Sequence, residues 1–571
     1  MIKRRLLFCL STILFTSAVR AEVSLTINGL EGELQDNVDA YLSAFSPEEY
    51  STSLRFRYRL EKRIKQALRA LGYYHPDILF RAEGEHLLLT VTPGSPVIIE
   101  QSDIVLEGEI SSDPDANALI SHSGLQKEAV VNHGNYQALK SGLRNLALAK
   151  GYFDGHFTRS ELAVAPDLNQ AFIHLHYSSG DRYHLGATRI EGSQIEESKV
   201  RSLIPYREGD VYRAATIARL SHNLSDSGWF SSVAVEPMLD STDKNGHLPM
   251  KVTLVPAAGN QLETGIGYST DVGPRASLNW DKPWVNLYGH SFESSLSFSE
   301  PEQTATLGYK IPLEDVLNEY YRIELGIKNL DDNDTQSLES SLKLERHWQL
   351  TSGWQRNASV RYLYEDYEQA SEEDELQMLL PGIAYSRTRI FAKDGVLPMR
   401  GNKQSVSAEI ADENLISPTR LLRLQGQASW VESIGPDHRA FVRLTAGANL
   451  VDNIEDIPPS LRFFAGGDSS LRGYDYESIS PRDEDGELIG ARYMATGTLE
   501  YQYRLTGSWW LAGFIDAGDA WSDSVPEWKQ GIGAGVRWIS PVGPVRLDFA
   551  WGQDTLSDDS FRIHFTLGAE L

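Results

Sequence analysis

Residues 462–481 form the stretch whose composition is most suggestive of chemistry. It reads Arg-Phe-Phe-Ala-Gly-Gly from 462 to 467 and continues through Leu471-Arg472-Gly473-Tyr474 to Pro481. Glycines permit tight turns, and an arginine can bind a carboxylate through two parallel N–H bonds. A plain surface loop rarely has this density of aromatic residues and glycines. The stretch therefore predicts a structured loop in which one arginine has a special place.

Signatures of catalysis are absent from the sequence. Gly289-His290-Ser291 is followed by Phe292-Glu293 and so lacks the Gly-x-Ser-x-Gly pattern of a nucleophile elbow. There is no His-Glu-x-x-His motif and no Gly-rich phosphate loop ending in Lys-Ser/Thr. His174 and His176 share one strand face, but two histidines without further spaced ligands are weak evidence for metal. We expect a non-enzyme with no catalytic residue, metal or other cofactor.

Composition and charge favour a membrane β-protein over a set of soluble domains. The 571 residues include 46 Gly, 25 Tyr and 12 Trp but only 6 Met, a mixture that suits β-strands with aromatic girdles. The formal charge of −26 argues against nucleic acid as a partner, because phosphate binding needs a basic surface. No stretch has about eighteen uninterrupted apolar residues, as a transmembrane helix requires.

Residues 1–21 have the pattern of a secretory signal. A basic start at Lys3, Arg4 and Arg5 precedes a short apolar run, and Val19-Arg20-Ala21 is a plausible cleavage site. The single cysteine, Cys9, lies inside this segment. We therefore expect an exported chain without thiols or disulfides.

Residues 22–256 repeat with a period near eighty. The repeated phrases are Leu71-Gly72-Tyr73-Tyr74, Lys150-Gly151-Tyr152-Phe153 and Ser227-Gly228-Trp229-Phe230. Each unit reads strand, helix, helix, strand, strand, with the glycine ending a helix and the aromatic residue after it in a small core. In the first unit the helix is expected over 54–71, with Leu54, Tyr58, Ile64, Leu68 and Leu71 at helical spacing.

These units resemble POTRA (polypeptide-transport-associated) domains, the periplasmic modules of outer-membrane assembly factors. We assign them to residues 22–96, 97–181 and 182–258. The resemblance implies that they pass unfolded β-rich clients toward a barrel. The physical route is β-augmentation, in which an extended client adds to an exposed sheet edge.

One helix of the first unit, expected over 54–71, is strongly basic in an acidic protein. Its cationic residues include Arg55, Arg59, Lys62, Arg63 and Lys65. They form either an ordinary solvated face or a docking surface for an acidic partner, and the sequence leaves both interpretations open.

From 259 to 571 the helical period gives way to alternation. Apolar residues recur at every second position, as at Tyr321, Ile323, Leu325 and Ile327, with charged residues between them. Sixteen segments begin near 261, 275, 291, 303, 320, 337, 355, 376, 403, 420, 438, 494, 508, 530, 543 and 560. A soluble β-sandwich is the alternative, but one-sided alternation over an even number of strands is typical of a transmembrane barrel. We therefore expect α+β POTRA repeats followed by an all-β, 16-stranded transmembrane barrel.

Leu471-Arg472-Gly473-Tyr474 is similar to the Val/Ile-Arg-Gly-Tyr/Phe signature of the assembly-factor superfamily. The resemblance implies a loop folded into the barrel, with its arginine paired to an aspartate in a late Phe-x-Asp-x-Gly strand. Here that strand contains Phe514, Asp516 and Gly518. Asp516 is opposite to Ile515 in the alternation and so is predicted to face the lumen. We expect these residues to act as a latch; a surface arginine and a turn-flanking aspartate are the alternative.

The first and last barrel strands must pair to close the barrel. Gly265, Gly267 and Gly568 lie in these strands, and interior glycines weaken strands. A weak seam could open sideways and let a client strand add to the exposed edge. Alternatively, the glycines let aromatic neighbours lie flat across the sheet.

Three POTRA units followed by sixteen strands resemble the TamA family of outer-membrane assembly factors. The resemblance implies insertion of autotransporters and other outer-membrane proteins. It also implies a barrel in the Gram-negative outer membrane, in contact with its lipid, and POTRA domains in the periplasm. The implied partners are unfolded outer-membrane protein clients and a TamB-like, inner-membrane-anchored subunit that spans the periplasm. A two-partner-type secretion transporter for one dedicated substrate and a passive porin remain the alternatives.

Overall fold

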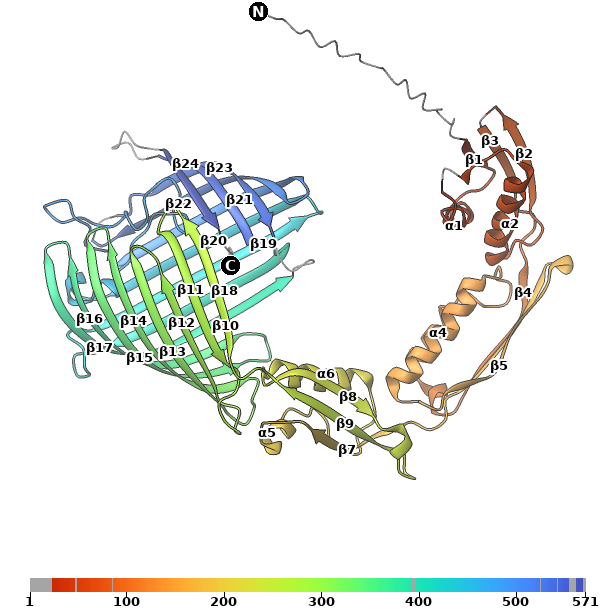
Figure 1. The fold of residues 1–571 in the computed structure, drawn as a ribbon, viewed down its shortest axis with the longest axis horizontal. Coiled ribbons are helices and arrows are strands. Elements are labelled where there is room, and N and C mark those ends of the chain that lie inside the picture. The colour runs from red at the N-terminus through yellow and green to blue at the C-terminus, as the bar shows by residue number, and fades with distance from the viewer. Residues whose placement is uncertain are drawn as a thin grey trace, which may run out of the picture. The chain divides into compact units, whose positions relative to one another are not determined.

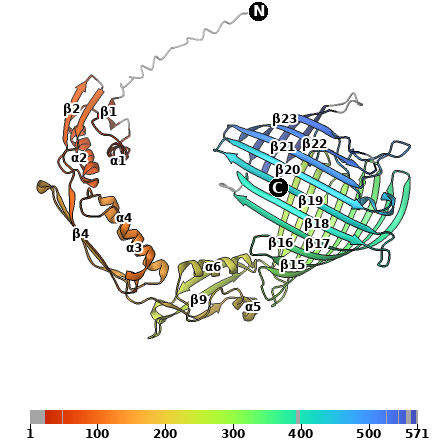
Figure 2. The ribbon, with the colours of Figure 1, turned by 180° about the vertical axis from the view of Figure 1, so that it is seen from behind.

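The computed structural model of the chain describes residues 23–46, 49–84, 86–391, 397–523, 525–541, 543–553 and 561–567. The predicted signal, residues 1–21, and Gly568 lie outside these ranges. The earlier part of the chain forms three-stranded sheets with helices, and the later part forms a closed barrel (Figures 1 and 2).

The three small sheets share one topology, in which the first strand of a unit pairs with the last. The first has the order β1-β3-β2, the second β4-β6-β5 and the third β7-β9-β8. The first unit consists of β1 (Ser24–Asn28), α1 (Glu33–Leu42), α2 (Leu54–Ala70), β2 (Asp77–Glu83) and β3 (His86–Thr92). The second consists of β4 (Ile98–Glu107), η2 (Glu109–Ser112), α3 (Pro114–Ser121), α4 (His133–Lys150), β5 (His156–Ala165), η3 (Pro166–Leu168) and β6 (Gln170–Ser178). The third consists of β7 (His184–Glu191), α5 (Glu197–Arg201), α6 (Ala214–Asp226), β8 (Phe230–Pro237), η4 (Leu239–Ser241) and β9 (His247–Pro256).

The predicted order of strand, helix, helix, strand, strand is therefore confirmed in each unit. Gly151 caps α4 in the left-handed conformation, with φ of 89°, which explains why a glycine recurs at the end of this helix. Each unit that precedes the barrel can thus be read from local signals.

The buried face of α2 differs from the expected one in its first two turns. Leu54 and Tyr58 are 82% and 70% exposed, whereas Phe56 and Leu60 join Ile64 in the core. The predicted helix is confirmed, but the prediction of which residues are buried in its first two turns is wrong. Apolar residues occur on both faces of this segment, so only the packing against α1 and the sheet could decide which face is covered.

The barrel contains sixteen strands, β10 to β25, each paired with its neighbours in sequence order. The first eight in sequence order are β10 (Gln261–Ser269), β11 (Gly273–Lys282), β12 (Ser291–Phe298), β13 (Glu302–Pro312), β14 (Glu319–Asp332), β15 (Thr335–Gln349), β16 (Gln355–Gln369) and β17 (Glu372–Phe391). The others are β18 (Arg400–Ala411), β19 (Leu421–Ile434), β20 (His438–Leu450), β21 (Tyr493–Thr506), β22 (Trp509–Trp521), β23 (Lys529–Ser540), β24 (Gly543–Gly552) and β25 (Phe561–Leu567). The predicted fold class is confirmed.

The two faces of the barrel wall differ as the alternation predicts. Ile515 on β22 and Leu499 on β21 are 50% and 57% exposed. The next residue of each strand, Asp516 and Glu500, is buried. Apolar positions therefore point outward and charged positions point into the lumen, as a barrel in lipid requires. Among the described residues, none of the helices has the length and apolar character needed to cross a membrane.

The connection between β20 and β21, residues 451–492, folds onto the lumenal side of the wall. It contains η5 (Ile454–Asp456) and η6 (Pro459–Leu461) and pairs with itself at Phe463↔Ala491 and Ala465↔Ile479. Phe463, Leu471 and Ile479 form a small apolar core with Ala520 of β22. The loop is thus a packed element, which is what positions the arginine at its centre.

Trp229, which is expected in the small core of the third unit, is buried against Phe230 and also contacts the connection between β11 and β12. Its indole N–H donates to the Gly289 carbonyl over 3.0 Å, and both residues belong to the compact unit that contains the barrel. Gly289 has φ of 73°, and a Cβ there would lie 2.1 Å from the indole ring. Glycine is therefore needed at this position for both the turn and the close approach.

Candidate functional site: an arginine latch in the barrel lumen

Arg472 is held by carboxylates from three strands. Nε and Nη2 donate to the two oxygens of Asp516 over 2.7 and 3.0 Å, and its backbone N–H donates to Oδ2 of the same residue over 3.1 Å. Nη1 donates to Glu500 over 2.7 Å and to Asp548 over 3.2 Å. All four side chains are at most 5% exposed. We call Arg472, Asp516, Glu500 and Asp548 the arginine latch.

The bonds of the latch are both strong and directional. Two parallel N–H bonds to Asp516 fix the orientation of the guanidinium as well as its distance. Removing one member of a buried ion cluster costs about 3–5 kcal/mol, because the remaining charges lose their compensation in a site without bulk water. The latch can therefore hold the loop in the lumen, and a single substitution can release it.

An aromatic ring and two glycines complete the space around the arginine. The Phe514 ring lies under the Arg472 guanidinium, with 3.4 Å between Cζ and the ring centroid, a cation–π arrangement. On β23, a Cβ at Gly531 would lie 1.9 Å from the Arg472 carbonyl oxygen, and one at Gly533 would lie 2.3 Å from the Phe514 ring. The glycines of β23 thus leave room for the loop.

Arg537 extends the latch along the inner wall. It donates to Glu500 over 2.9 Å and to Asp548 over 2.5 Å, so the two carboxylates are shared between Arg472 and Arg537. Gln502 donates to Glu500 over 2.7 Å and accepts from Arg439 over 2.6 Å. These buried groups form one connected network across β20 to β24, and such networks rigidify their surroundings when every member is bonded.

The other residues expected in the latch lie around it. The Gly473 N–H donates to Nε2 of His564 over 3.0 Å, and a Cβ at Gly473 would lie 2.6 Å from the Gly552 nitrogen. The Tyr474 hydroxyl donates to the Gln530 carbonyl over 3.4 Å. Gly518 lies farther along β22, where a Cβ would contact the Ala495 carbonyl at 2.7 Å. Gly518 therefore serves the packing of β22 on β21.

A second arginine anchors the start of the loop. Arg462 donates from Nη2 to Glu372 over 2.8 Å, from Nε to the Ile457 carbonyl over 2.9 Å and from Nη1 to the Ile489 carbonyl over 3.0 Å. Its side chain is fully buried. Arg462 closes the loop on itself and ties it to β17, whereas Arg472 ties it to β21, β22 and β24.

The structure describes one end of the seam between β10 and β25, since β25 is described only to Leu567. There, the two strands share the residue pair Ser269↔Thr566, and the Thr270 N–H donates to the Phe565 carbonyl over 3.0 Å. Gly265 and Gly267 lie on β10, where a Cβ would approach Ser277 and Arg275 of β11 to 2.5 and 2.8 Å. A side chain at either glycine would therefore press on β11, and the weak seam stays a prediction.

The basic residues of α2 lie on its solvent-facing side. Arg59 pairs with Glu49 over 3.1 Å and Lys65 pairs with Glu61 over 2.6 Å, both at the surface. Arg55, Lys62 and Arg63 are also exposed. They form a basic face together with the exposed Leu54 and Tyr58.

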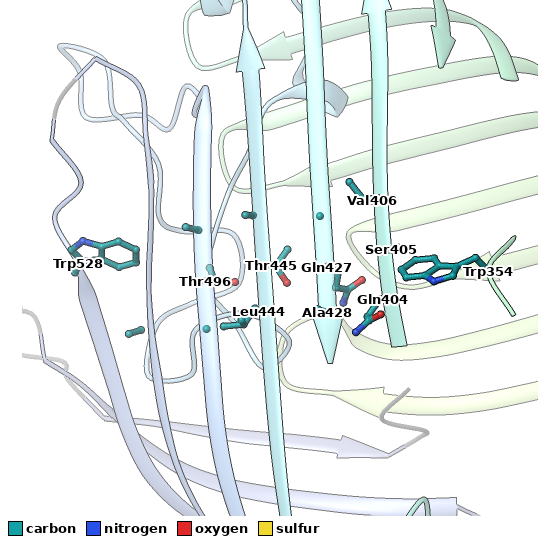
Figure 3. Close-up of a pocket in the computed structure, with 15 residues that line it drawn as sticks. Trp354, Gln404, Ser405, Val406, Gln427, Ala428, Leu444, Thr445, Thr496 and Trp528 are labelled. Atoms are coloured by element: carbon teal, nitrogen blue, oxygen red, sulfur yellow. The ribbon is translucent and has the colours of Figure 1, made fainter. Parts of the chain in front are cut away.

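A separate apolar hollow of about 660 Å³ lies over β18 to β22, between Trp354 and Trp528 (Figure 3). Val406 and Leu444, which line it, are 52% and 50% exposed and belong to the outward-facing set. The hollow therefore faces lipid and contains no residue of the arginine latch. In the described ranges, no group of three or more His, Cys, Asp or Glu residues could hold a metal.

Sequence reasoning missed Glu500, Asp548 and Arg537 as members of the site. Each is a charged residue at a lumenal position of a strand, and charges are disfavoured inside strands. That signal could have nominated them, but many lumenal positions are charged. Which of them meet depends on the stagger of neighbouring strands, and this is a property of the closed barrel.

Comparison with known proteins supports the architecture. Residues 258–571 match the model of the Omp85 superfamily domain. The chain belongs to the Omp85 superfamily. Residues 24–93 match the model "POTRA domain TamA domain 1", and residues 183–256 match a POTRA model described as "Surface antigen variable number repeat". The barrel lies in the outer membrane and the POTRA domains lie in the periplasm.

Similar Omp85 proteins include the outer membrane protein assembly factor BamA of Nitratidesulfovibrio vulgaris. It is 26% identical over 420 residues, which are 68% of this chain and 51% of the relative. BamA of Neisseria meningitidis is 21% identical over 544 residues, 81% of this chain and 66% of the relative. The chain thus spans between about half and two thirds of these relatives' length.

Among solved structures, BamA from Haemophilus ducreyi lacking POTRA domains 1–3 has the same fold. The TM-score is 0.69 at 14% identity, and the match covers 82% of this chain and 99% of the other. This likeness in fold agrees with the Omp85 assignment.

Proposed function

We propose that this chain is a non-enzymatic assembly factor of the TamA family, which inserts autotransporters and other β-barrel clients into the outer membrane. The match of residues 24–93 to a TamA-specific POTRA model supports the family. The names of the Omp85 relatives, outer membrane protein assembly factors, support the kind of activity.

The observation that carries the proposal is the loop that a buried ion cluster holds in the lumen beside the first and last strands. Its residue Asp468 is bonded to Asp271, in the turn after β10, and to Thr566 on β25. When two neighbouring strands separate, each exposes N–H and C=O groups that form a template for another strand. We propose that a client strand adds to β10 by β-augmentation in this way, and that the remaining client strands then follow into the membrane.

The arginine latch supplies the control in this proposal. It holds residues 451–492 in the lumen while the barrel is idle, and its few bonds can be broken when a client arrives. A passive porin needs a water-filled lumen, and a packed loop held there by a buried ion cluster narrows this passage. The latch thus favours the assembly factor over the porin.

The periplasmic units supply the route to the barrel. Each sheet ends in strands that have one neighbour in the described residues, such as β2, β5 and β8. We propose that extended clients add to these edges. We also propose that the basic face of α2 docks a TamB-like, inner-membrane-anchored subunit that spans the periplasm.

Reconstitution tests the proposed function. The purified chain in liposomes, offered an unfolded autotransporter barrel, is expected to speed the appearance of the folded, protease-resistant client. Liposomes with a conventional porin are the control. Equal rates in the two preparations would refute the proposal. Export of a soluble substrate without folding of any barrel client would support the two-partner secretion transporter instead.

The docking proposal has its own test. The triple charge reversal Arg59→Glu, Arg63→Glu and Lys65→Glu is expected to reduce co-purification of the periplasm-spanning subunit at least about tenfold, since it replaces attraction by repulsion at the surface. The matched control reverses Lys140, Arg144 and Arg159 of the second unit. Equal recovery with both variants would show that the basic face of α2 is only a solvated surface.

A further inference from the structure

The loop that carries Arg472 also contacts both strands of the seam. The backbone N–H of Asp468 donates to Oδ2 of Asp271, in the turn that follows β10, over 2.6 Å. The hydroxyl of Thr566 on β25 donates to Oδ2 of Asp468 over 2.7 Å. Asp468 thus has a hydrogen bond to each side of the seam.

Two neighbouring loop residues add contacts to β25 alone. Gly473 donates its N–H to His564, and Asp475 pairs with Arg562 over 2.8 Å. The loop therefore rests on β25 at three places, while its bond across the seam passes through Asp468. This bond lies directly beside the described backbone contacts at the seam, the pair Ser269↔Thr566 and the bond from the Thr270 N–H to the Phe565 carbonyl.

We infer that Asp468 is a positioning residue of the seam, which holds the β10 turn and β25 together so that the barrel opens sideways only when the loop moves. The inference rests on the proposed function, in which the seam admits a client strand. It adds a coupling that the Arg472–Asp516 pair does not contain. If the loop moves away, the bonds of Asp468 across the seam are lost. Conversely, separation of the strands breaks bonds that hold the loop in place.

The close approach of Asp468 to Asp271 requires a special backbone. Gly467 has φ of 96°, and a Cβ there would lie 2.5 Å from Oδ2 of Asp271. A side chain at this position would push the loop away from the β10 turn. Gly467 is thus explained by the approach of the loop to the seam, whereas a Cβ at Gly466 would meet the Asp475 carbonyl within the loop itself.

The electrostatics of the contact favour release over permanent closure. Burial and the neighbouring Asp271 carboxylate raise the pKa of Asp468. Burial also acts to raise the pKa of Asp271, but hydrogen bonds from His564 and from the Asp468 N–H lower it overall. Two carboxyl groups that approach each other repel when both are ionised. The bond across the seam is therefore weaker than the arginine latch.

Populations of the closed and open seam measure the proposed coupling. Ile266 on β10 and Ile563 on β25 are 89% and 48% exposed on the lipid face, and the one native cysteine, Cys9, lies in the predicted signal. Spin labels on Ile266→Cys and Ile563→Cys in the full chain, in liposomes, report the separation of the strands by pulsed electron paramagnetic resonance.

Three substitutions test the bond itself. Asp468→Ala and Thr566→Val each remove the hydrogen bond between these side chains and are expected to lower the closed-to-open ratio about fivefold, the effect of one lost hydrogen bond. Thr566→Ser keeps the hydroxyl and is expected to match the unsubstituted chain. Because both deletions remove one bond, the double variant is expected to lower the ratio no further than either single variant.

The outcomes separate the inference from the proposed function. If Thr566→Val and Asp468→Ala leave the populations unchanged, or if their effects simply add, Asp468 does not hold the seam. If the populations shift as expected but the unsubstituted chain inserts no client, the coupling stands and the proposed function fails. Heat-dependent mobility on gels shows whether each variant has a folded barrel, so that misfolding is recognised separately.

Discussion

The wall around β15 and the described end of the seam between β10 and β25 differ in what joins the strands. β15 shares fourteen residue pairs with β14 and fifteen with β16, so this part of the wall is stabilised by many backbone bonds that break together. At the described end of the seam, a loop residue also joins the two sides, because Asp468 is bonded to Asp271 after β10 and to Thr566 on β25. A bond of this kind depends on the position of the loop as well as on the strands.

This difference indicates where control can reside. A ladder of fourteen or fifteen pairs does not depend on one side chain, whereas a contact made by a loop changes when the loop moves. The loop 451–492 has such contacts, because its latch lies on β21, β22 and β24 and other bonds of the loop reach β25 and the β10 turn. Three substitutions probe this contrast, and a change of pH probes a joint outside the barrel.

The largest effect is expected for Arg472→Ala. It removes the arginine that pairs with Asp516, leaves Glu500 and Asp548 with Arg537 alone, and costs the loop about 3–5 kcal/mol of stabilisation. The loop is expected to become sensitive to protease, and client insertion is expected to fall. Arg482→Ala, which removes an exposed loop arginine bonded to the Gly486 carbonyl, is the matched control. Equal protease resistance of the two variants would contradict the latch.

A smaller effect is expected for Gly531→Ala, which leaves every charge in place. The new Cβ would lie 1.9 Å from the Arg472 carbonyl, so the loop must shift at a cost of about 1–3 kcal/mol. Protease sensitivity of the loop is again the measurement. Gly513→Ala on β22 has open space at the Cβ position and serves as control. If the loop is equally resistant to protease in both variants, Gly531 of β23 does not determine where the loop packs.

A still smaller effect is expected for Gly267→Val on the seam. The new Cβ would lie 2.8 Å from Nε of Arg275 and 3.3 Å from the Leu567 carbonyl of β25, and Arg275 donates to that carbonyl over 3.0 Å. The Arg275 side chain must move, which weakens this bond by about 1 kcal/mol, so the closed population of the spin-labelled seam is expected to fall. Gly326→Val on β14, where the Cβ would press on the Ser341 hydroxyl inside the wall, is expected to leave that population unchanged. An equal fall with both variants would mean that the seam has no special role.

The smallest effect concerns a joint outside the barrel and depends on pH. Tyr74 and His133 meet between the first two small sheets, with 2.6 Å between the hydroxyl and Nε2. Burial, and then the charge of Arg69, lower the pKa of His133 below its ordinary value of 6.5. The unfolded state therefore takes up a proton first, and the stabilisation present above about pH 6.5 is lost as the pH falls through this range toward the folded pKa.

Thermal unfolding of the full chain, followed by the helical circular dichroism signal, checks this prediction. The midpoint is expected to fall between pH 7.5 and pH 5.5, and His133→Asn is expected to remove part of the dependence. His122→Asn, at an exposed position in the second unit, is the control.

Much of the architecture followed from local patterns. All sixteen barrel strands begin within four residues of their predicted starts, because strand alternation and turn residues are encoded over a few positions. The contact of Arg472 with Asp516 was also anticipated, through two short motifs. The phase of α2 was not, since Leu54 and Tyr58 satisfy the helical period but face solvent.

Local patterns were thus enough to predict the repeated α/β units, the count of barrel strands and the lumenal direction of Asp516, and a short motif predicted the arginine that binds it. The folded barrel was needed to show that Glu500, Asp548 and Arg537 join this arginine, and that Asp468 meets both Asp271 and Thr566. Alternation tells which face of a strand a residue takes. Which residues of different strands meet depends on the stagger and closure of the whole barrel, and those arise only when every strand has found its neighbour.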